Sequence, residues 1–82
     1  MDADHSRITL VTRPGCHLCD VARVTVSAVA AEVGVGWTEV SIEDDAVLRE
    51  RYAEQIPVTL VDGARHDYWR VDAGRLRAAL GA

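Results

Sequence analysis

Two cysteines, Cys16 and Cys19, are the only thiols of this 82-residue chain, and they lie three positions apart in the segment RPGCHLCD. Thiols at this spacing can cycle between dithiol and disulfide, supply two ligands of a metal site, or be two small buried side chains. The thiolate, rather than the thiol, attacks disulfides and binds metals. The chemistry of the pair therefore depends on what surrounds the two sulfur atoms.

The residues before Cys16 predict a surrounding that favours a thiolate. Pro14 and Gly15 end an apolar run, so Cys16 is expected where a strand gives way to a helix. The unpaired N–H groups and the positive dipole end of a helix's first turn both stabilise negative charge. Cys19 follows one turn later on the same face, within reach of a disulfide. We therefore expect Cys16 to be the catalytic nucleophile and Cys19 to resolve the mixed disulfide that forms on it.

A metal site is the main alternative chemistry. Structural zinc takes four ligands, so the pair would need two more from acidic residues or from His5, His17 and His66, none of which has a zinc-finger spacing. A c-type haem site would need histidine directly after the second cysteine, where Asp20 stands. We expect no metal ligand in the chain. An iron–sulfur cluster shared by two chains through Cys16, and a pair of inert cysteines, remain as alternatives.

The elements that must position the pair alternate between strand and helix patterns. The apolar, β-branched run at 8–11 indicates a strand. Apolar residues spaced by three and four before Gly34 indicate one face of a helix, and Asp62-Gly63 indicates a tight hairpin turn. The first strand–helix–strand unit should be a right-handed parallel crossover, to which the hairpin adds an antiparallel half. The expected elements are a strand at 8–11, a helix that ends at Gly34, a strand at 36–44, a helix from Asp44 or Asp45 to about 54, strands at 58–61 and 64–71, and a short helix capped by Asp72.

Apolar side chains on the expected helices should face one core. On the first helix they share a face through spacings of four and three; on the second they lie on its inner side; on the last they are one turn apart. These residues are Leu18, Ala22, Val26, Val29 and Val33, then Val47, Leu48 and Tyr52, then Leu76 and Leu80.

The composition fits a single domain that spans 1–82. Hydrophobic residues make up 49% of the chain, enough for a core without disulfide or metal staples, and the net charge is −4. This charge argues against nucleic acid and anionic membranes as partners. No segment reaches the ~18 apolar residues of a membrane span, and the N-terminal residues have no signal-peptide pattern. We expect a cytoplasmic monomer, in a compartment where a close cysteine pair is more often catalytic or metal-binding than structural.

RPGCHLCD after a strand, QIPVTLVDG near the middle and the order of elements resemble a short glutaredoxin-like protein of the thioredoxin fold. The resemblance covers roughly residues 7–80. It implies an α/β fold of order β-α-β-α-β-β-α, with a four-stranded mixed sheet flanked by helices. It also implies a thiol–disulfide oxidoreductase that reduces a protein or small-thiol disulfide and is reset by glutathione or by a thioredoxin-reductase-like system. A non-catalytic adaptor of the same fold is a further alternative.

The resemblance also implies substrate-binding residues. The proline that matches Pro57 follows a cis peptide bond and faces the cysteines, and X–Pro bonds adopt cis at modest cost. Ile56 and Val58 flank it, so the backbone there can pair with an extended substrate segment. Arg13 matches a basic residue before the Pro-Gly turn; it either supports the Cys16 thiolate or is simply solvated.

The sequence departs from the family pattern at two places. His17 and Leu18 stand between the cysteines, and YWRVDAG, which contains Trp69, replaces the Gly-Gly turn that helps to hold glutathione. We therefore expect glutathione to be a weak reductant and no cofactor to be bound. Asp72 either meets the amino end of glutathione or caps a helix. His17 either adds charge near Cys16 or points to solvent, and Trp69 either rims the site or packs within a strand.

Overall fold

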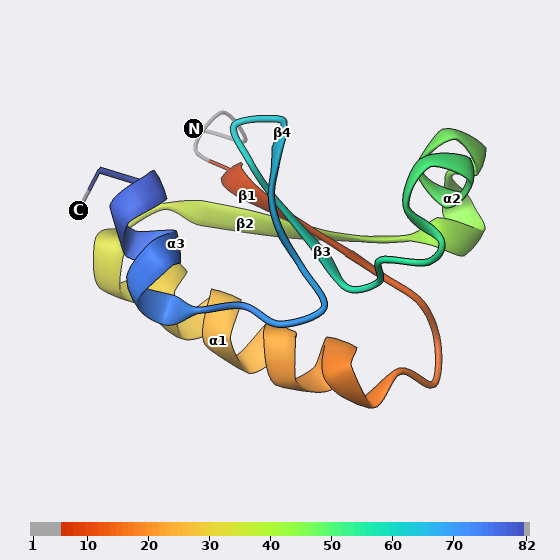
Figure 1. Ribbon diagram of the computed structural model, residues 1–82. Coiled ribbons are helices and arrows are strands. Elements are labelled where there is room, and N and C mark those ends of the chain that lie inside the picture. The colour runs from red at the N-terminus through yellow and green to blue at the C-terminus, as the bar shows by residue number, and fades with distance from the viewer. Residues whose placement is uncertain (1–5, 82) are drawn as a thin grey trace.

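A mixed sheet of four strands, flanked by three α-helices, makes up the computed structural model, which describes residues 6–81 (Figure 1). The order of elements along the chain confirms the predicted β-α-β-α-β-β-α succession. The elements are β1 (Ser6–Thr12), α1 (His17–Val33), β2 (Gly36–Ser41), a 3₁₀ turn η2 (Ile42–Asp44), α2 (Ala46–Tyr52), β3 (Val58–Val61), β4 (Ala64–Tyr68) and α3 (Ala73–Ala79).

The sheet has the strand order β2-β1-β3-β4, so β1 and β3 are its interior strands. β1 pairs in parallel with β2 across the α1 crossover, and it pairs antiparallel with β3. Val11 near the end of β1 lies opposite Val58 at the start of β3. The turn at residues 14–15, which leads to the cysteines, therefore leaves the sheet beside the loop that contains Pro57.

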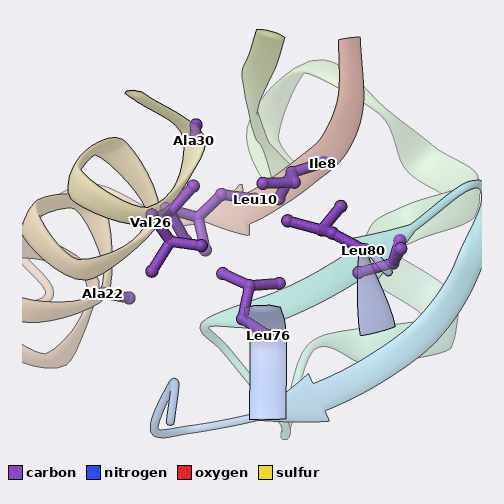
Figure 2. Packing of buried hydrophobic residues seen from close by; sticks show 9 residues of the cluster. Ile8, Leu10, Ala22, Val26, Ala30, Leu76 and Leu80 are labelled. Carbon is purple, nitrogen blue, oxygen red and sulfur yellow. The ribbon is translucent and has the colours of Figure 1, made fainter. Parts of the chain in front are cut away.

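Two apolar clusters hold the helices on the sheet. In Figure 1, α1 and α3 lie below the strands and α2 lies above them at one end. The larger cluster joins α1 and α3 to β1, with Leu10, Val26 and Leu76 fully buried (Figure 2). The smaller cluster joins α2 to the ends of β1 and β3, and Cys19 belongs to it. The resolving cysteine of the prediction is thus also a core residue.

The second helix differs from its prediction at both ends. β2 stops at Ser41, whose hydroxyl accepts the N–H of Glu43 and turns the chain into η2, so the expected strand to residue 44 is wrong. Asp45 is the cap of α2, and the helix ends at Tyr52 rather than near 54. Val47 was expected on the inner side but is 64% exposed, because it lies in the first turn on the side away from the core.

The last strand is shorter than predicted because of Trp69. Its backbone has a φ of 65°, in the left-handed region, so β4 ends at Tyr68 instead of residue 71. The hairpin turn is as predicted, with positive φ at both Asp62 and Gly63. Gly34 ends α1 as expected. Within residues 6–81, no helix has the length and apolar character that a membrane span requires.

Candidate active site

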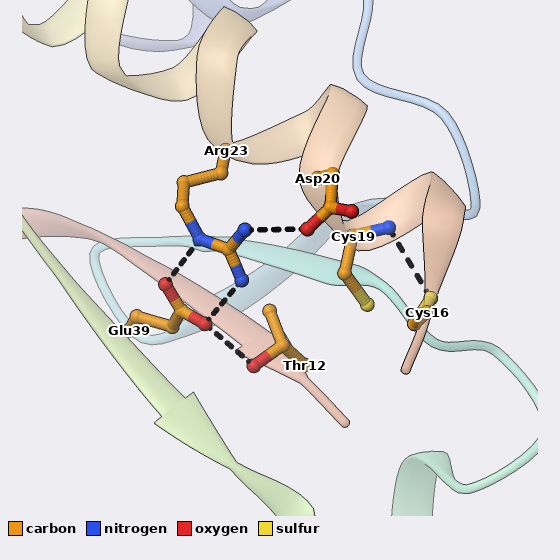
Figure 3. Close-up of polar contacts among 6 residues, drawn as sticks. All are labelled: Thr12, Cys16, Cys19, Asp20, Arg23 and Glu39. Carbon is orange, nitrogen blue, oxygen red and sulfur yellow. Dashed lines mark hydrogen bonds and ion pairs between the residues drawn. The ribbon is translucent and has the colours of Figure 1, made fainter. Parts of the chain in front are cut away.

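Cys16 occupies the N-cap position of α1, as the sequence predicts. Gly15 turns the chain out of β1 with a φ of 70°, and the Cys16 backbone is extended at the helix boundary. The sulfur of Cys16 accepts the backbone N–H of Cys19 at 3.2 Å (Figure 3). This sulfur is partly exposed. The site therefore presents a partly exposed cysteine whose sulfur accepts an N–H of the first helical turn.

Cys19 has the opposite surroundings. It is 1% exposed and packs in the cluster that contains Val11, Ile56 and Val58. Burial, together with the interaction with Cys16, raises the pKa of the Cys19 thiol to about 11. Both cysteines are free thiols in this structure. The two cysteines thus differ in exposure. Cys16 is accessible from solvent, whereas Cys19 is enclosed by apolar side chains.

An ion-pair cluster, which the sequence analysis did not predict, lies beside the cysteines (Figure 3). Arg23 on α1 donates to Glu39 on β2 through two bonds of 2.7 Å, and to Asp20 at 2.8 Å. Thr12 donates its hydroxyl hydrogen to Glu39 at 2.9 Å. The bonds from Arg23, with a contribution from Thr12, lower the pKa of Glu39. The Asp20–Arg23 spacing is a sequence signal that could have been noticed, whereas Glu39 joins only through the sheet.

The loop before β3 lies against the cysteine pair. The Ile56–Pro57 peptide bond is cis, as the family resemblance implied. Pro57 and Val58 are both fully buried, and Val58 is paired with strands on both sides. Ile56 shares its apolar cluster with Cys19 and lines a surface hollow. Of the three residues predicted to bind substrate here, Ile56 is 6% exposed and lines the hollow, while Pro57 and Val58 are fully buried.

Two hollows flank the start of α1 and share Arg13. One, of about 230 Å³, contains Cys16 and the Arg23–Glu39 pair. The other has a volume of about 460 Å³. Its lining includes Arg13, Leu18, Glu54, Ile56, Trp69 and Arg70. Arg13 is therefore positioned between the exposed sulfur and the larger hollow.

Trp69 ties the end of β4 to the Pro57 loop. Its backbone N–H donates to the carbonyl of Pro57 at 2.7 Å, and its indole N–H donates to the carbonyl of Glu54 at 3.2 Å. The ring is 52% exposed and meets the ring of Tyr68 edge-on, with 5.0 Å between the centroids. Trp69 therefore lies at the rim of the hollow and not within a strand.

The remaining candidates lie outside this arrangement. His17 is exposed at the first position of α1. Asp72 caps α3, with its carboxylate accepting the N–H of Arg75 at 2.8 Å. His66 is on β4, and His5 lies outside the described residues. Between residues 6 and 81, no three His, Cys, Asp or Glu side chains are grouped so that they could hold a metal ion.

Similar sequences and structures agree with this architecture. The sequence profile of the glutaredoxin-like domain (DUF836) matches residues 7–81. Uncharacterized protein Rv0508 of Mycobacterium tuberculosis is 32% identical over 79 residues, which cover 90% of this chain and 81% of the relative.

Three solved structures share the fold. Protein XcR50 from X. campestris has a TM-score of 0.72 and 38% identity, over 90% of this chain and 95% of that one. Protein Ne2328 from Nitrosomonas europaea has a TM-score of 0.75 at 18% identity, over 95% and 94%. Fasciola hepatica thioredoxin has a TM-score of 0.61 at 20% identity, over 90% and 76%. The predicted thioredoxin-like fold is thereby confirmed.

Proposed function

Since this chain belongs to the glutaredoxin-like domain family, we propose that it is a thiol–disulfide oxidoreductase whose redox couple is Cys16 and Cys19. One observation carries the proposal. An accessible sulfur at a helix N-terminus accepts an N–H from a second, buried cysteine one turn later. A structural pair would have no need of this asymmetry between an exposed and a buried thiol.

The proposed reaction transfers two electrons to a disulfide substrate. The Cys16 thiolate attacks one substrate sulfur, forms a mixed disulfide and expels the other substrate sulfur as a thiolate, which takes a proton from water. Cys19 then gives up its proton and attacks the sulfur of Cys16. The second substrate thiolate leaves, and a Cys16–Cys19 disulfide remains. An external thiol reductant returns the two electrons.

The burial of Cys19 supports this order of events. With a pKa of about 11, the Cys19 thiol is protonated at neutral pH and competes poorly for substrate. After Cys16 has formed the mixed disulfide, the neighbouring sulfur of Cys16 is the electrophile closest to Cys19 along the helix. The attack is then intramolecular, which compensates for a small thiolate fraction.

We propose a thioredoxin-reductase-like system, in the cytoplasm, as the better electron donor and glutathione as the weaker one. Trp69 and Arg70 stand where the family resemblance places a Gly-Gly turn, and the exposed indole of Trp69 occupies the rim of the hollow. The carboxylate of Asp72 is engaged as the cap of α3. Neither the indole of Trp69 at the rim nor the engaged carboxylate of Asp72 favours the binding of glutathione beside the cysteines.

The test is a disulfide-reduction assay on insulin, run once with glutathione and glutathione reductase and once with thioredoxin reductase. The Cys16→Ser variant should lose activity with both donors. The Cys19→Ser variant should retain the first step and accumulate a mixed disulfide, which mass spectrometry of the intact protein detects. Activity that survives Cys16→Ser would refute the proposal, and a brown protein with visible absorbance would instead point to a shared iron–sulfur cluster.

A further inference from the structure

Trp69 has a backbone conformation that is unfavourable for its residue type. Its φ of 65° lies in the left-handed region, which a residue with a side chain adopts only at a cost. The N–H of Arg70 donates to the carbonyl of Tyr68 at 2.8 Å, so Trp69 is the centre of a three-residue turn. With a positive φ at its centre, such a turn is the rare and strained form. Glycine would adopt this turn more easily, so we looked for a contact that only the indole supplies.

The contact lies on the loop at 53–57, which joins α2 to β3. The indole N–H of Trp69 donates to the carbonyl of Glu54 at 3.2 Å. Its backbone N–H donates to the carbonyl of Pro57 at 2.7 Å, with a longer contact of 3.4 Å to that of Gln55. Within the part of the chain that the structure describes, Trp69 supplies all the hydrogen bonds that the carbonyls of this loop accept. One residue at the end of β4 therefore restrains the path of the whole loop (Figure 1).

Side chains of β4 support the indole in this position. The ring of Tyr68 meets it edge-on, with 5.0 Å between the centroids. The guanidinium of Arg65 lies 5.6 Å from the centroid of the Tyr68 ring and donates to the side-chain oxygen of Gln55 at 3.1 Å. The indole is therefore packed on one side although it is 52% exposed, and the same group of residues reaches the loop twice.

The inner side of the loop lies against the cysteine pair. Ile56 is 6% exposed and belongs to the same apolar cluster as Cys19, and Cys16 packs against that cluster. Leu18, which stands between the cysteines, lines one hollow together with Ile56 and Trp69. Burial is the largest cause of the raised pKa of Cys19. The path of the loop therefore affects how completely Cys19 is covered.

We propose that Trp69 is a positioning residue of the redox pair, which holds the loop at 53–57 so that Ile56 covers Cys19. Cys16 is then left as the sulfur that meets a disulfide from outside. Trp69 acts through the loop and not on the reacting atoms. This inference rests on the proposed function, since it assigns a role within the same site.

The test measures the reactivity of Cys19 without disulfide chemistry. In the Cys16→Ser background Cys19 is the only thiol, and its alkylation by iodoacetamide is followed from pH 8 to pH 11. Trp69→Phe keeps an aromatic ring but has no indole N–H, and it should raise the alkylation rate at pH 8.5 about fivefold. The pKa read from the pH profile should also be lower in this variant, because Cys19 is less completely buried.

Trp37→Phe in the same background is the matched control. Trp37 packs against the larger apolar cluster, so the same substitution there should leave the alkylation rate of Cys19 unchanged. Trp69→Gly removes the ring but relieves the strained backbone, so it tests the indole even where Trp69→Phe does not fold. It should raise the rate at least as much as Trp69→Phe.

Urea distinguishes a displaced loop from general destabilisation. Opening of one loop exposes little surface, so the alkylation rate of Cys19 in the Trp69 variants should stay constant up to about 1 M urea. Parent-like rates in both Trp69 variants, an equal rise in Trp37→Phe, or a rise that grows with urea as the protein unfolds would overturn the inference.

A small disulfide separates this inference from the proposed function. Cystamine is added to the Cys19→Ser variant, whose remaining thiol is Cys16. Formation of the mixed disulfide releases one cysteamine thiolate, and mass spectrometry of the intact protein detects the adduct. Absence of the adduct would refute the proposed function, while the alkylation rates of Cys19 would still decide whether Trp69 positions the loop.

Discussion

The backbone N–H of Cys19 donates to the sulfur of Cys16 at 3.2 Å, so the buried cysteine contributes directly to the surroundings of the exposed one. The two cysteines have unlike surroundings. Cys16 gains a hydrogen-bond donor at the surface, while Cys19 is enclosed by the smaller apolar cluster. Two thiols of identical chemistry therefore have different surroundings.

Selective alkylation should reveal this difference. With iodoacetamide at pH 7, Cys16 should react at least ten times faster than Cys19, because Cys19 is 1% exposed and its pKa is about 11. Peptide mass spectrometry of the reduced protein at short reaction times measures both rates. The single-cysteine variants Cys16→Ser and Cys19→Ser are the controls. Faster labelling of Cys19 would mean that the two roles are reversed.

The raised pKa of Cys19 should also make the stability of the reduced protein depend on pH. Folding raises this pKa from 9.0 to about 11, so the proton is held more tightly in the folded state. The resulting stabilisation is present below pH 9 and is lost progressively as the pH rises from 9 to 11. Urea unfolding of the parent protein and of Cys19→Ala, at pH 8.5 and 10.5 with a reductant present, measures it. Between these two pH values, the free energy of unfolding should fall more steeply for the parent than for Cys19→Ala. An equal fall in both proteins would contradict the raised pKa of Cys19.

The Arg23–Glu39 pair should contribute more to stability than an ordinary surface ion pair. Glu39 accepts three hydrogen bonds and joins α1 to β2, so Glu39→Gln should lower the free energy of unfolding by about 1 kcal/mol at pH 7. The pKa of Glu39 is lowered in the folded state, so the stabilisation is present above pH 4.5 and fades as the pH falls below it.

The matched control for that substitution is Glu32→Gln. Glu32 pairs with Arg77 through one bond of 2.6 Å between exposed side chains, which should be worth less than about 0.5 kcal/mol. Urea denaturation at pH 7 and pH 4 compares the two variants. If both variants lost the same free energy of unfolding at pH 7, the three hydrogen bonds of Glu39 would stabilise the fold no more than the single bond of Glu32.

Asp72 offers a test between a structural and a ligand-binding role. Its carboxylate caps α3, so Asp72→Ala should cost about 1 kcal/mol of unfolding free energy, whereas Asp72→Asn should cost little because asparagine caps equally well. The KM for glutathione in the reduction assay should be the same for Asp72→Asn and the parent. A KM raised severalfold by Asp72→Asn alone would show that the charge meets the amino group of glutathione.

Some features of this protein follow from the sequence alone because their causes are local. The Pro14-Gly15 turn, the cysteine that caps α1 and the glycine that ends it depend on residues within a few positions of one another. The Asp62-Gly63 hairpin is equally local. The order of strands and helices, and the position of Cys16 at the start of a helix, could therefore be predicted correctly.

Other features were decided by the tertiary structure because they join segments that are distant in the chain. Glu39 meets Arg23 only because the α1 crossover brings β2 beside β1, and Trp69 ends β4 early because its N–H bonds the carbonyl of Pro57. The burial that separates Cys19 from Cys16 comes from the apolar cluster that α2, β1 and β3 form together. The sequence determined where the thiols lie along the chain, whereas packing between distant elements decided which of them is buried.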